Sequence, residues 1–327
     1  MSIRSAIVVL GVCAGACVHG SPVFTAGDIF WVSKKPMKMF EVTGGGNFAA
    51  AVPQTVFTNT WESLGNLVFA EDGSVGYLTA TTANGSLGAL VKLNPDGTQS
   101  TLLNPTSPSA LALLGDTIYF TNTPGTLSKV VNGVATSVLS GLGTPRAMVA
   151  YNGGLLITEQ SGGRIRQVTF NGSTAVSTNL YSGLVQPVDL AILGGYLYYS
   201  SVVKSTLNET ITKVVKIDLA TGVKTDHAWG QKFYGLTVAG GRLLSSNYKE
   251  GTSSIWDITN YGDYSAASPW ATGLQGFGDL MFATVPGTPP APPTGPGPEP
   301  PAETPEVSAM LLVATGLAMI GARAIRI

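Results

Sequence analysis

The chain has few residues that bind transition metals. Of its 327 residues only two are cysteines and two are histidines. Both cysteines, Cys13 and Cys17, lie among the first 20 residues. Beyond that segment the chain has no thiol and one histidine, His227, so a zinc or copper site is disfavoured. We expect His227, next to Asp226, to be a solvated residue of an outer strand or turn rather than part of a Ser-His-Asp triad.

Charged residues and helical periodicity are also scarce. Asp, Glu, Lys and Arg make up 11% of the chain, and the formal net charge is -1. Without a basic stripe, a nucleic-acid partner is disfavoured. The middle of the chain lacks the apolar spacing of a helix, so helices should be rare there. The 41 glycines, 20 prolines and short runs of Val, Ile, Thr and Tyr are typical of an all-β protein with tight turns.

The beginning of the chain is arranged like a secretory signal peptide. Arg4 supplies a positive charge, residues 6–17 are apolar, and residues 18–20 offer a cleavage site. We therefore expect residues 1–20 to be removed by signal peptidase and the protein to be extracellular. Lipidation at Cys17 and an ordinary buried first strand are the less favoured alternatives.

The centre of the chain contains the same unit twice. Residues 107–121 and 144–158 both read as proline, an apolar strand, a glycine-rich turn and a second apolar strand. Each unit then closes on an Asn-Gly turn, at Asn132 and Asn171. Four short antiparallel strands that repeat at about 40 residues are the signature of a β-propeller blade.

Aligning this unit along the chain predicts six blades over residues 21–285. The predicted first strands are residues 63–67, 108–111, 145–148, 187–190, 234–236 and 278–280. The predicted second strands are residues 76–81, 117–122, 155–159, 196–201 and 242–247. Residues 27–33 resemble a second strand, and residues 277–283 supply the missing first one. The C-terminal strand should therefore pair with the N-terminal blade and close the ring, which leaves no open edge.

The order of proline, a small or acidic residue, leucine and then Gly-X-Leu/Ile-Tyr resembles NHL-repeat and SMP-30/gluconolactonase-like six-bladed propellers, over residues 26–284. In the gluconolactonase-like enzymes, the resemblance implies a divalent metal held by one Glu with an Asn and an Asp, and an Asp as general base. The candidate residues at the channel mouth are Glu62, Asn66, Asn122, Arg146, Glu159, Asp189, Asn247 and Asp279.

Two interpretations of these candidates remain open. Glu62, Asp189 and Asp279, with Asn122 or Asn247, would imitate the metal ligands, and calcium is the ion suited to such oxygens. The positive charge of Arg146 would compete with that ion. Alternatively, these side chains satisfy strand ends and one another around a water-filled channel.

The end of the chain differs in composition. Residues 286–304 form a linker rich in proline and glycine, which we expect to be extended. Residues 305–327 contain Pro305-Glu306, an apolar helix candidate, and then Arg323 and Arg326. This tail resembles the PEP-CTERM sorting signal of Gram-negative bacteria, although Val307 stands where that family has its second proline. The resemblance implies processing by an exosortase-type enzyme and a helix inserted in the membrane at least transiently; a plain membrane anchor is the alternative.

Together these patterns predict a secreted, envelope-sorted propeller that binds or scaffolds an envelope protein or glycan rather than acting as an enzyme. The alternative is a calcium-type lactonase or hydrolase of the SMP-30-like kind. The fold is far better specified than the activity, because propellers carry binding proteins and enzymes alike.

Overall fold

A computed structural model describes the central part of the chain. The described residues are 24, 29–33, 38–42, 52–56, 63–81, 88–94, 98–104, 107–123, 125–172, 174–204, 210–247, 253–274 and 281–284. The predicted signal peptide, linker and sorting signal lie outside them, and so do Glu62, Asp279, Pro305, Glu306, Arg323 and Arg326. None of the described residues belongs to a helix long and apolar enough to cross a membrane.

The described residues form six β-sheets, five of them built from strands close together in the sequence. The first contains β4 (Ser63–Phe69), β5 (Gly76–Thr81), β6 (Gly88–Leu93) and β7 (Gln99–Leu103). The second contains β8 (Pro108–Leu114), β9 (Thr117–Asn122), β10 (Thr126–Val131) and β11 (Val134–Leu139). The third is β12 (Pro145–Tyr151), β13 (Gly154–Glu159), β14 (Arg164–Asn171) and β15 (Thr174–Tyr181).

Two more of these sheets follow along the chain. The fourth contains β16 (Pro187–Leu193), β17 (Tyr196–Lys204), β18 (Thr210–Asp218), β19 (Lys224–Trp229) and the short β23 (Gly262–Asp263). The fifth contains β20 (Phe233–Ala239), β21 (Arg242–Asn247), β22 (Ser253–Asp257) and β24 (Ala271–Leu274). The remaining sheet joins both ends of the described chain: β1 (Ile29–Ser33), β2 (Lys38–Val42), β3 (Val52–Val56) and β25 (Met281–Thr284).

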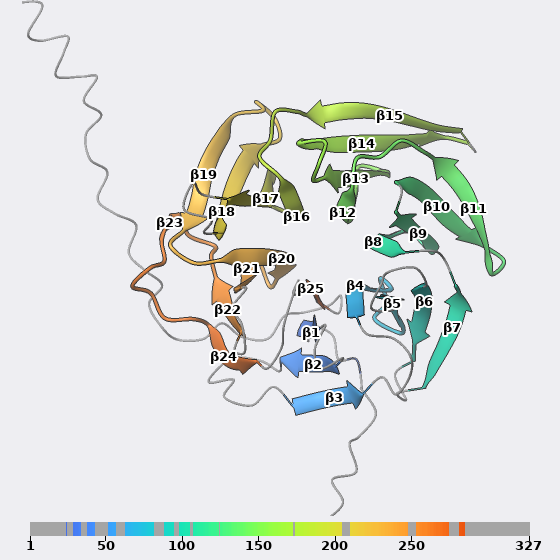
Figure 1. Cartoon of the computed structure of the whole chain (residues 1–327), viewed down its shortest axis with the longest axis horizontal. Coiled ribbons are helices and arrows are strands. Elements are labelled where there is room, and N and C mark those ends of the chain that lie inside the picture. Colours follow the sequence, from blue (N-terminus) through green and yellow to red (C-terminus); the bar gives the residue numbers. More distant parts are fainter. Residues whose placement is uncertain are drawn as a thin grey trace, which may run out of the picture.

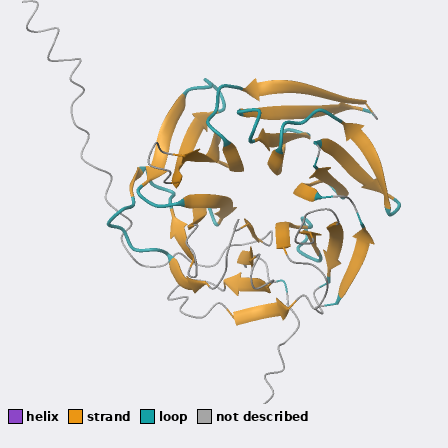
Figure 2. Ribbon diagram, viewed as in Figure 1, coloured by secondary structure: helices purple, strands orange, loops and turns teal. Residues whose placement is uncertain are grey.

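The sheets are arranged around a central axis, with β4, β8, β12, β16, β20 and β25 innermost (Figure 1). Successive innermost strands contact one another around this ring. The described residues consist of strands and connecting loops, without helices (Figure 2). The predicted all-β propeller fold is thereby confirmed.

The two ends of the described chain meet in one sheet. β25 pairs antiparallel with β1, so that Met281 lies opposite Val32 and Thr284 opposite Ile29. This is the pairing of C-terminal strand and N-terminal sheet that the sequence predicted. It hydrogen-bonds the inner edge of β1, which would otherwise be open.

A hydroxyl group joins the first and second strands in four of the sheets. At a shift in register, a backbone N–H of the first strand donates to a Thr or Ser of the second. These bonds are Ala110 to Thr121 (2.9 Å), Ala147 to Thr158 (2.9 Å), Asp189 to Ser200 (3.1 Å) and Gly235 to Ser246 (2.9 Å). The hydroxyl thus satisfies a donor that the irregular pairing leaves outside the ladder.

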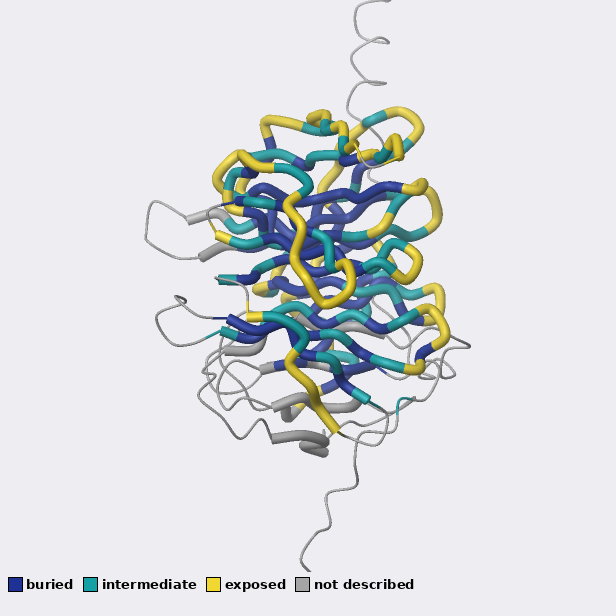
Figure 3. The backbone as a smooth tube through the Cα atoms, turned by 90° about the vertical axis from the view of Figure 1, so that its right-hand side faces the viewer, coloured by how far each residue is buried: buried dark blue, intermediate teal, exposed yellow. Residues whose placement is uncertain are grey.

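The hydrophobic core lies between neighbouring sheets rather than within one of them. Phe30 of β1 packs in one cluster with Phe69 and Leu78 of the next sheet, and Tyr119 of β9 shares another with Met148 of β12. Buried backbone accordingly runs through the middle of the molecule and exposed turns lie at its outside (Figure 3). Each sheet therefore depends on both neighbours for the burial of its apolar side chains.

His227 does not lie on the surface as the sequence predicted. Its side chain is 2% exposed, its ring meets Tyr198 edge-on at 4.8 Å, and Nε2 lies 2.7 Å from the carbonyl oxygen of Ile258. β19 is covered because β23 pairs with it in parallel and the chain after β22 folds over it. No other sheet among the described residues has such a fifth strand, so the repeat gave no sign of it.

Candidate functional site

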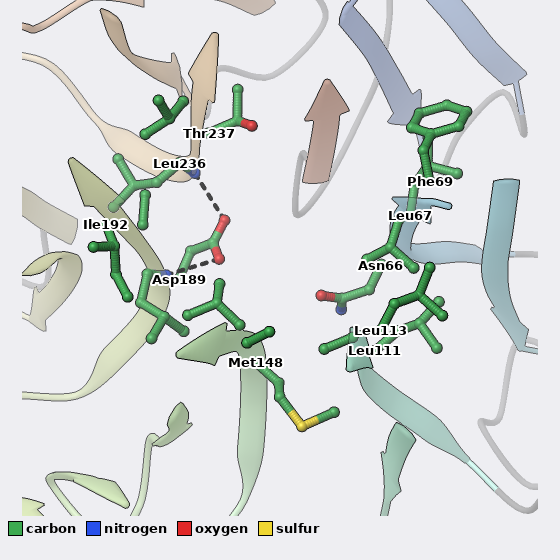
Figure 4. Close-up of a pocket in the computed structure, with 17 residues that line it drawn as sticks. Asn66, Leu67, Phe69, Leu111, Leu113, Met148, Asp189, Ile192, Leu236 and Thr237 are labelled. Carbon is green, nitrogen blue, oxygen red and sulfur yellow. Dashed lines mark hydrogen bonds between the residues drawn. The ribbon is translucent and has the colours of Figure 1, made fainter. Parts of the chain in front are cut away.

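A cavity of about 400 Å³ lies inside the ring of innermost strands. Residues of β4, β8, β12, β16 and β20 line it, because the inner edge of each sheet faces the axis (Figure 4). Most lining side chains are apolar, among them Phe69, Leu113, Met148, Ile192 and Leu236. Asp189 and Asn66 are the polar exceptions that face each other across the cavity, and Thr237 lies on the wall beside Leu236 (Figure 4).

Asp189 is a carboxylate with little access to water. It is 7% exposed, and its two oxygens accept hydrogen bonds from the backbone N–H groups of Leu190 (2.8 Å) and Leu236 (2.7 Å). Burial raises the pKa of Asp189 to about 7, although these two hydrogen bonds and the charge of Arg146 oppose the rise. The Leu236 bond joins β16 to β20, so Asp189 also links two sheets.

Asn66 occupies the opposite wall of the cavity. Its Nδ2 donates a 2.7 Å hydrogen bond to the carbonyl oxygen of Ser109 on the neighbouring sheet. This bond orients the side-chain amide, so its oxygen turns toward the cavity (Figure 4). Ser109 in turn donates to the carbonyl oxygen of Pro145 at 2.9 Å, which carries the network to a third sheet.

Arg146 and Tyr234 lie two residues before the first lining residue of their strands, Met148 and Leu236. The Arg146 guanidinium donates a 2.8 Å hydrogen bond from Nη2 to the Tyr234 hydroxyl. β12 and β20 are separated in the ring by β16, so this bond connects two sheets that are not neighbours. Neither residue belongs to the described cavity lining, but the charge of Arg146 acts on Asp189. Tyr234 was not among the candidate site residues predicted from the sequence. Its position in the repeat is the same as that of Arg146, and this equivalence could have indicated it.

Glu159 belongs to a separate cluster and not to the cavity lining. Its side chain is fully buried, and it forms ion pairs with Arg164 (2.9 Å) and Arg166. The backbone N–H of Gly143 also donates to it at 2.7 Å. Burial by itself would raise the pKa of Glu159, but the hydrogen bonds from Arg166, Gly143 and Arg164 outweigh it and hold this pKa below its usual value. The structure thus shows Glu159 in an ion-pair cluster of β13 and β14, and the described cavity lining does not include it.

The two candidate asparagines have local partners. Asn122 accepts a 3.1 Å hydrogen bond from the backbone N–H of Thr126 and so caps the turn between β9 and β10. Asn247 donates to the side-chain oxygen of Gln231 at 3.0 Å. Neither residue lines the cavity. Of the six predicted candidates that the structure describes, Asn66 and Asp189 line it, whereas Glu62 and Asp279 lie outside the described residues.

The described part of the chain brings together no group of three His, Cys, Asp or Glu side chains that could hold a metal. A calcium site needs six to eight oxygen ligands. Asp189 and Asn66 lie on opposite walls, and no other carboxylate or amide side chain belongs to the described cavity lining. The described lining therefore fits an organic molecule better than a hard metal ion.

Comparisons with known proteins support the fold. No known protein family and no curated protein sequence matches the chain. Among solved structures, a chain of a nidogen/laminin complex matches with a TM-score of 0.58 and 14% identity, covering 80% of this chain and 99% of that one. A putative 6-phosphogluconolactonase from Bacteroides uniformis matches with a TM-score of 0.47 and 16% identity, covering 71% of this chain and 79% of that one. At these identities the likeness to the nidogen/laminin chain shows that this chain has a β-propeller fold.

Proposed function

We propose that this protein is a secreted, envelope-sorted β-propeller that binds or scaffolds a partner at the cell surface, and that the partner is a glycan. The observation that carries this proposal is the outer surface of β11 and β15, two neighbouring outer strands. Their sequences, Val-Ala-Thr-Ser-Val-Leu and Thr-Ala-Val-Ser-Thr-Asn-Leu-Tyr, contain no charged residue.

This surface has the chemistry of an uncharged polymer. Val134 is 62% exposed and Val176 51% exposed, and exposed Thr136 and Thr178 lie on the same two strands. The threonine hydroxyl groups can hydrogen-bond sugar hydroxyls, and the valine side chains can cover the apolar faces of the sugar rings. An envelope protein is the other partner class, and the nidogen/laminin complex is an example of a chain of similar fold in a complex between proteins.

We further propose six blades, the sheet of β1, β2, β3 and β25 being the one that closes the ring. The six sheets and the β25–β1 pairing support this count. The proposed location, outside a Gram-negative cell after processing by signal peptidase and an exosortase-type enzyme, is supported by the sequences of the two ends. The C-terminal segment would then enter the membrane at least transiently.

Binding of envelope polysaccharide by the full chain tests the proposal. We expect the purified protein to bind immobilised polysaccharide from the producing cells. The double variant Thr136→Glu/Thr178→Glu should bind at least about tenfold more weakly, because each charge must be desolvated. Thr101→Glu, on the exposed part of β7, is the matched control and should bind normally. Equal binding by the double variant and the wild type would rule out this surface.

A second candidate function is a calcium-type lactonase, favoured by one observation. Asp189 lies in the channel with a pKa of about 7, which suits a general base near neutral pH. Calcium should then raise the melting temperature of the protein, and Asp189→Ala should abolish the increase. If millimolar calcium leaves the melting temperature unchanged, the calcium enzyme is rejected.

A further inference from the structure

The central cavity has the size and lining of a small-molecule site. Its volume of about 400 Å³ lies within the range of pockets that hold small ligands. Phe69, Leu113 and Ile192 contribute apolar wall on three different strands, β4, β8 and β16. Such walls favour the burial of an apolar group.

The polar groups that face this cavity are hydrogen-bond acceptors. The Asp189 oxygens each accept one backbone N–H, and a carboxylate oxygen has room for a second donor. Within the described part of the chain, no group donates to the side-chain oxygen of Asn66, whose Nδ2 is held by Ser109. The Asp189 carboxylate and the Asn66 side-chain oxygen, on facing walls, therefore suit a molecule that carries hydrogen-bond donors.

We propose that the cavity binds a small organic cation, a protonated amine with an apolar body, with its ammonium group between Asp189 and Asn66. The apolar body then lies against Phe69, Leu113 and Ile192. This site does not depend on the outer surface of β11 and β15, and either can exist without the other.

The buried carboxylate of Asp189 favours a cation over an anion, although the positive charge of Arg146 acts on it. Arg146 of β12 is the charged group that acts on Asp189 among the described residues, and its guanidinium donates to Tyr234 of β20. In spite of Arg146, burial still raises the pKa of Asp189 to about 7, so the carboxylate remains short of stabilising charge. An ammonium group would supply that charge, whereas an anion would add repulsion.

The number of oxygen ligands favours an organic cation over a metal ion. An ammonium group needs up to three acceptors, which Asp189 and Asn66 can supply from opposite sides. Calcium would need at least six oxygens at one point, and the neighbouring wall residues are apolar. The ligand class is therefore a primary amine with a hydrocarbon or aromatic body.

Calorimetric titration of the full chain with three matched probes tests this site. The probes are benzylammonium, its neutral counterpart benzyl alcohol, and the anion benzoate. At about pH 8 benzylammonium should bind at least about tenfold more tightly than either of the others. Its affinity should fall by a similar factor at about pH 5, where Asp189 is protonated.

Variants locate the binding within the ring. Asp189→Asn should weaken benzylammonium binding at least about tenfold at pH values near 8. Leu113→Trp, which fills the cavity and keeps the carboxylate, should abolish it. Asp226→Asn, an exposed carboxylate of β19 that pairs with Lys213, is the matched control and should leave it unchanged. If Asp189→Asn does not fold, the pH dependence of the wild type and Leu113→Trp decide.

Three results would overturn the proposal. One is the absence of benzylammonium binding to the wild type at either pH. Another is equally tight binding of benzoate, since the site would then not select positive charge. The third is benzylammonium binding that neither Asp189→Asn nor Leu113→Trp weakens, because the cation would then lie outside the cavity.

Discussion

Burial acts differently on three titratable side chains of this protein. Glu159 is buried with two arginines and keeps its charge. Asp189 is buried with two backbone donors, and its pKa rises to about 7. His227 is buried against a tyrosine ring, and its pKa falls because burial disfavours the charged imidazole. The partner, more than the depth of burial, decides which protonation state the fold selects.

Glu159→Gln should destabilise the protein strongly. The substitution leaves Arg164 and Arg166, whose side chains are 29% and 15% exposed, without a counter-charge. Breaking a buried ion pair in this way costs about 3 kcal/mol in the free energy of unfolding. Urea unfolding of wild type and variant measures the difference.

A surface ion pair provides the control for Glu159. Asp226→Asn removes the partner of Lys213. Both side chains are more than a third exposed, Asp226 at 54% and Lys213 at 35%. Its loss should cost less than about 1 kcal/mol. The contribution of the Glu159 charge should be complete above its unfolded-state pKa of 4.5 and be lost as the pH falls from there through its lower folded-state pKa. Equal effects of the two variants would show that the Glu159 cluster adds nothing beyond an exposed pair.

His227 should make stability fall in mild acid. Its folded-state pKa lies below the unfolded value of 6.5, so the unfolded chain binds the proton first as the pH decreases. Stability from neutral His227 is complete above about pH 6.5 and is lost as the pH falls below it. Asp189 acts in the opposite sense over part of this range, since its folded-state pKa is raised.

The two effects are separated by the variant His227→Gln. Glutamine is neutral and can still donate a hydrogen bond to the carbonyl oxygen of Ile258. The difference in unfolding free energy between wild type and variant should therefore shift in favour of the variant between about pH 7.5 and about pH 5. A difference that does not change with pH would mean that His227 is solvated in the folded state.

At the scale of elements, the sequence predicted strands better than it predicted side-chain partners. The bounds expected for β5, β9 and β21 agree with the structure, because each follows a glycine-rich turn that repeats in register. Glu159 holds the same alignment position as Asn122 and Asn247, yet each finds a different partner. Those partners lie in the following strand or in another loop. The repeat is shared by the first two strands of each sheet only, so it does not specify the residues of these other segments.

The hydroxyl link between first and second strands should be essential in the sheet of β12 to β15. Thr158 accepts from the N–H of Ala147 and donates to the carbonyl oxygen of Val188 on the next sheet, both at 2.9 Å. Thr158→Val keeps the shape but leaves both buried backbone groups unsatisfied, which should cost about 2 to 4 kcal/mol.

An exposed threonine of the same sheet is the control for that substitution. Thr178→Val lies on the outer strand β15 and should change stability by less than about 0.5 kcal/mol. Chemical denaturation of both variants gives the comparison. If Thr158→Val is as mild as Thr178→Val, the hydroxyl bond is a by-product of strand pairing and not a requirement for it.

At the scale of the whole molecule, the repeat predicted the ring but not its interior. The alignment placed Asp189, Asn66 and Arg146 near the axis, and the first two line the cavity while the charge of the third acts on Asp189. The apolar character of the lining was not predicted. In five of the six sheets the same leucine or methionine position both packs between sheets and lines the cavity, as at Leu67, Leu111, Met148, Leu190 and Leu236. Sequence periodicity assigns such a residue to the core and gives no sign of a cavity beside it.

The ring also predicts that a short C-terminal strand controls the stability of the entire domain. β25 pairs with β1 and contacts β4 and β20, so it connects the first and last parts of the chain. A chain that ends after residue 280 lacks β25 and exposes the inner edge of β1. We expect it to unfold at a much lower temperature and to be cut rapidly by protease, because the apolar faces on either side of the gap lose a neighbour.

A chain that ends after Thr284 is the matched control, since it keeps β25 and removes only the residues beyond this strand. It should melt close to the full chain and resist protease over the described residues. The two truncations differ by four residues, so a large difference between them can be assigned to the strand itself. If both melt together with the full chain, the pairing of β25 with β1 does not hold the ring closed, and the remaining sheets are stable as an open array.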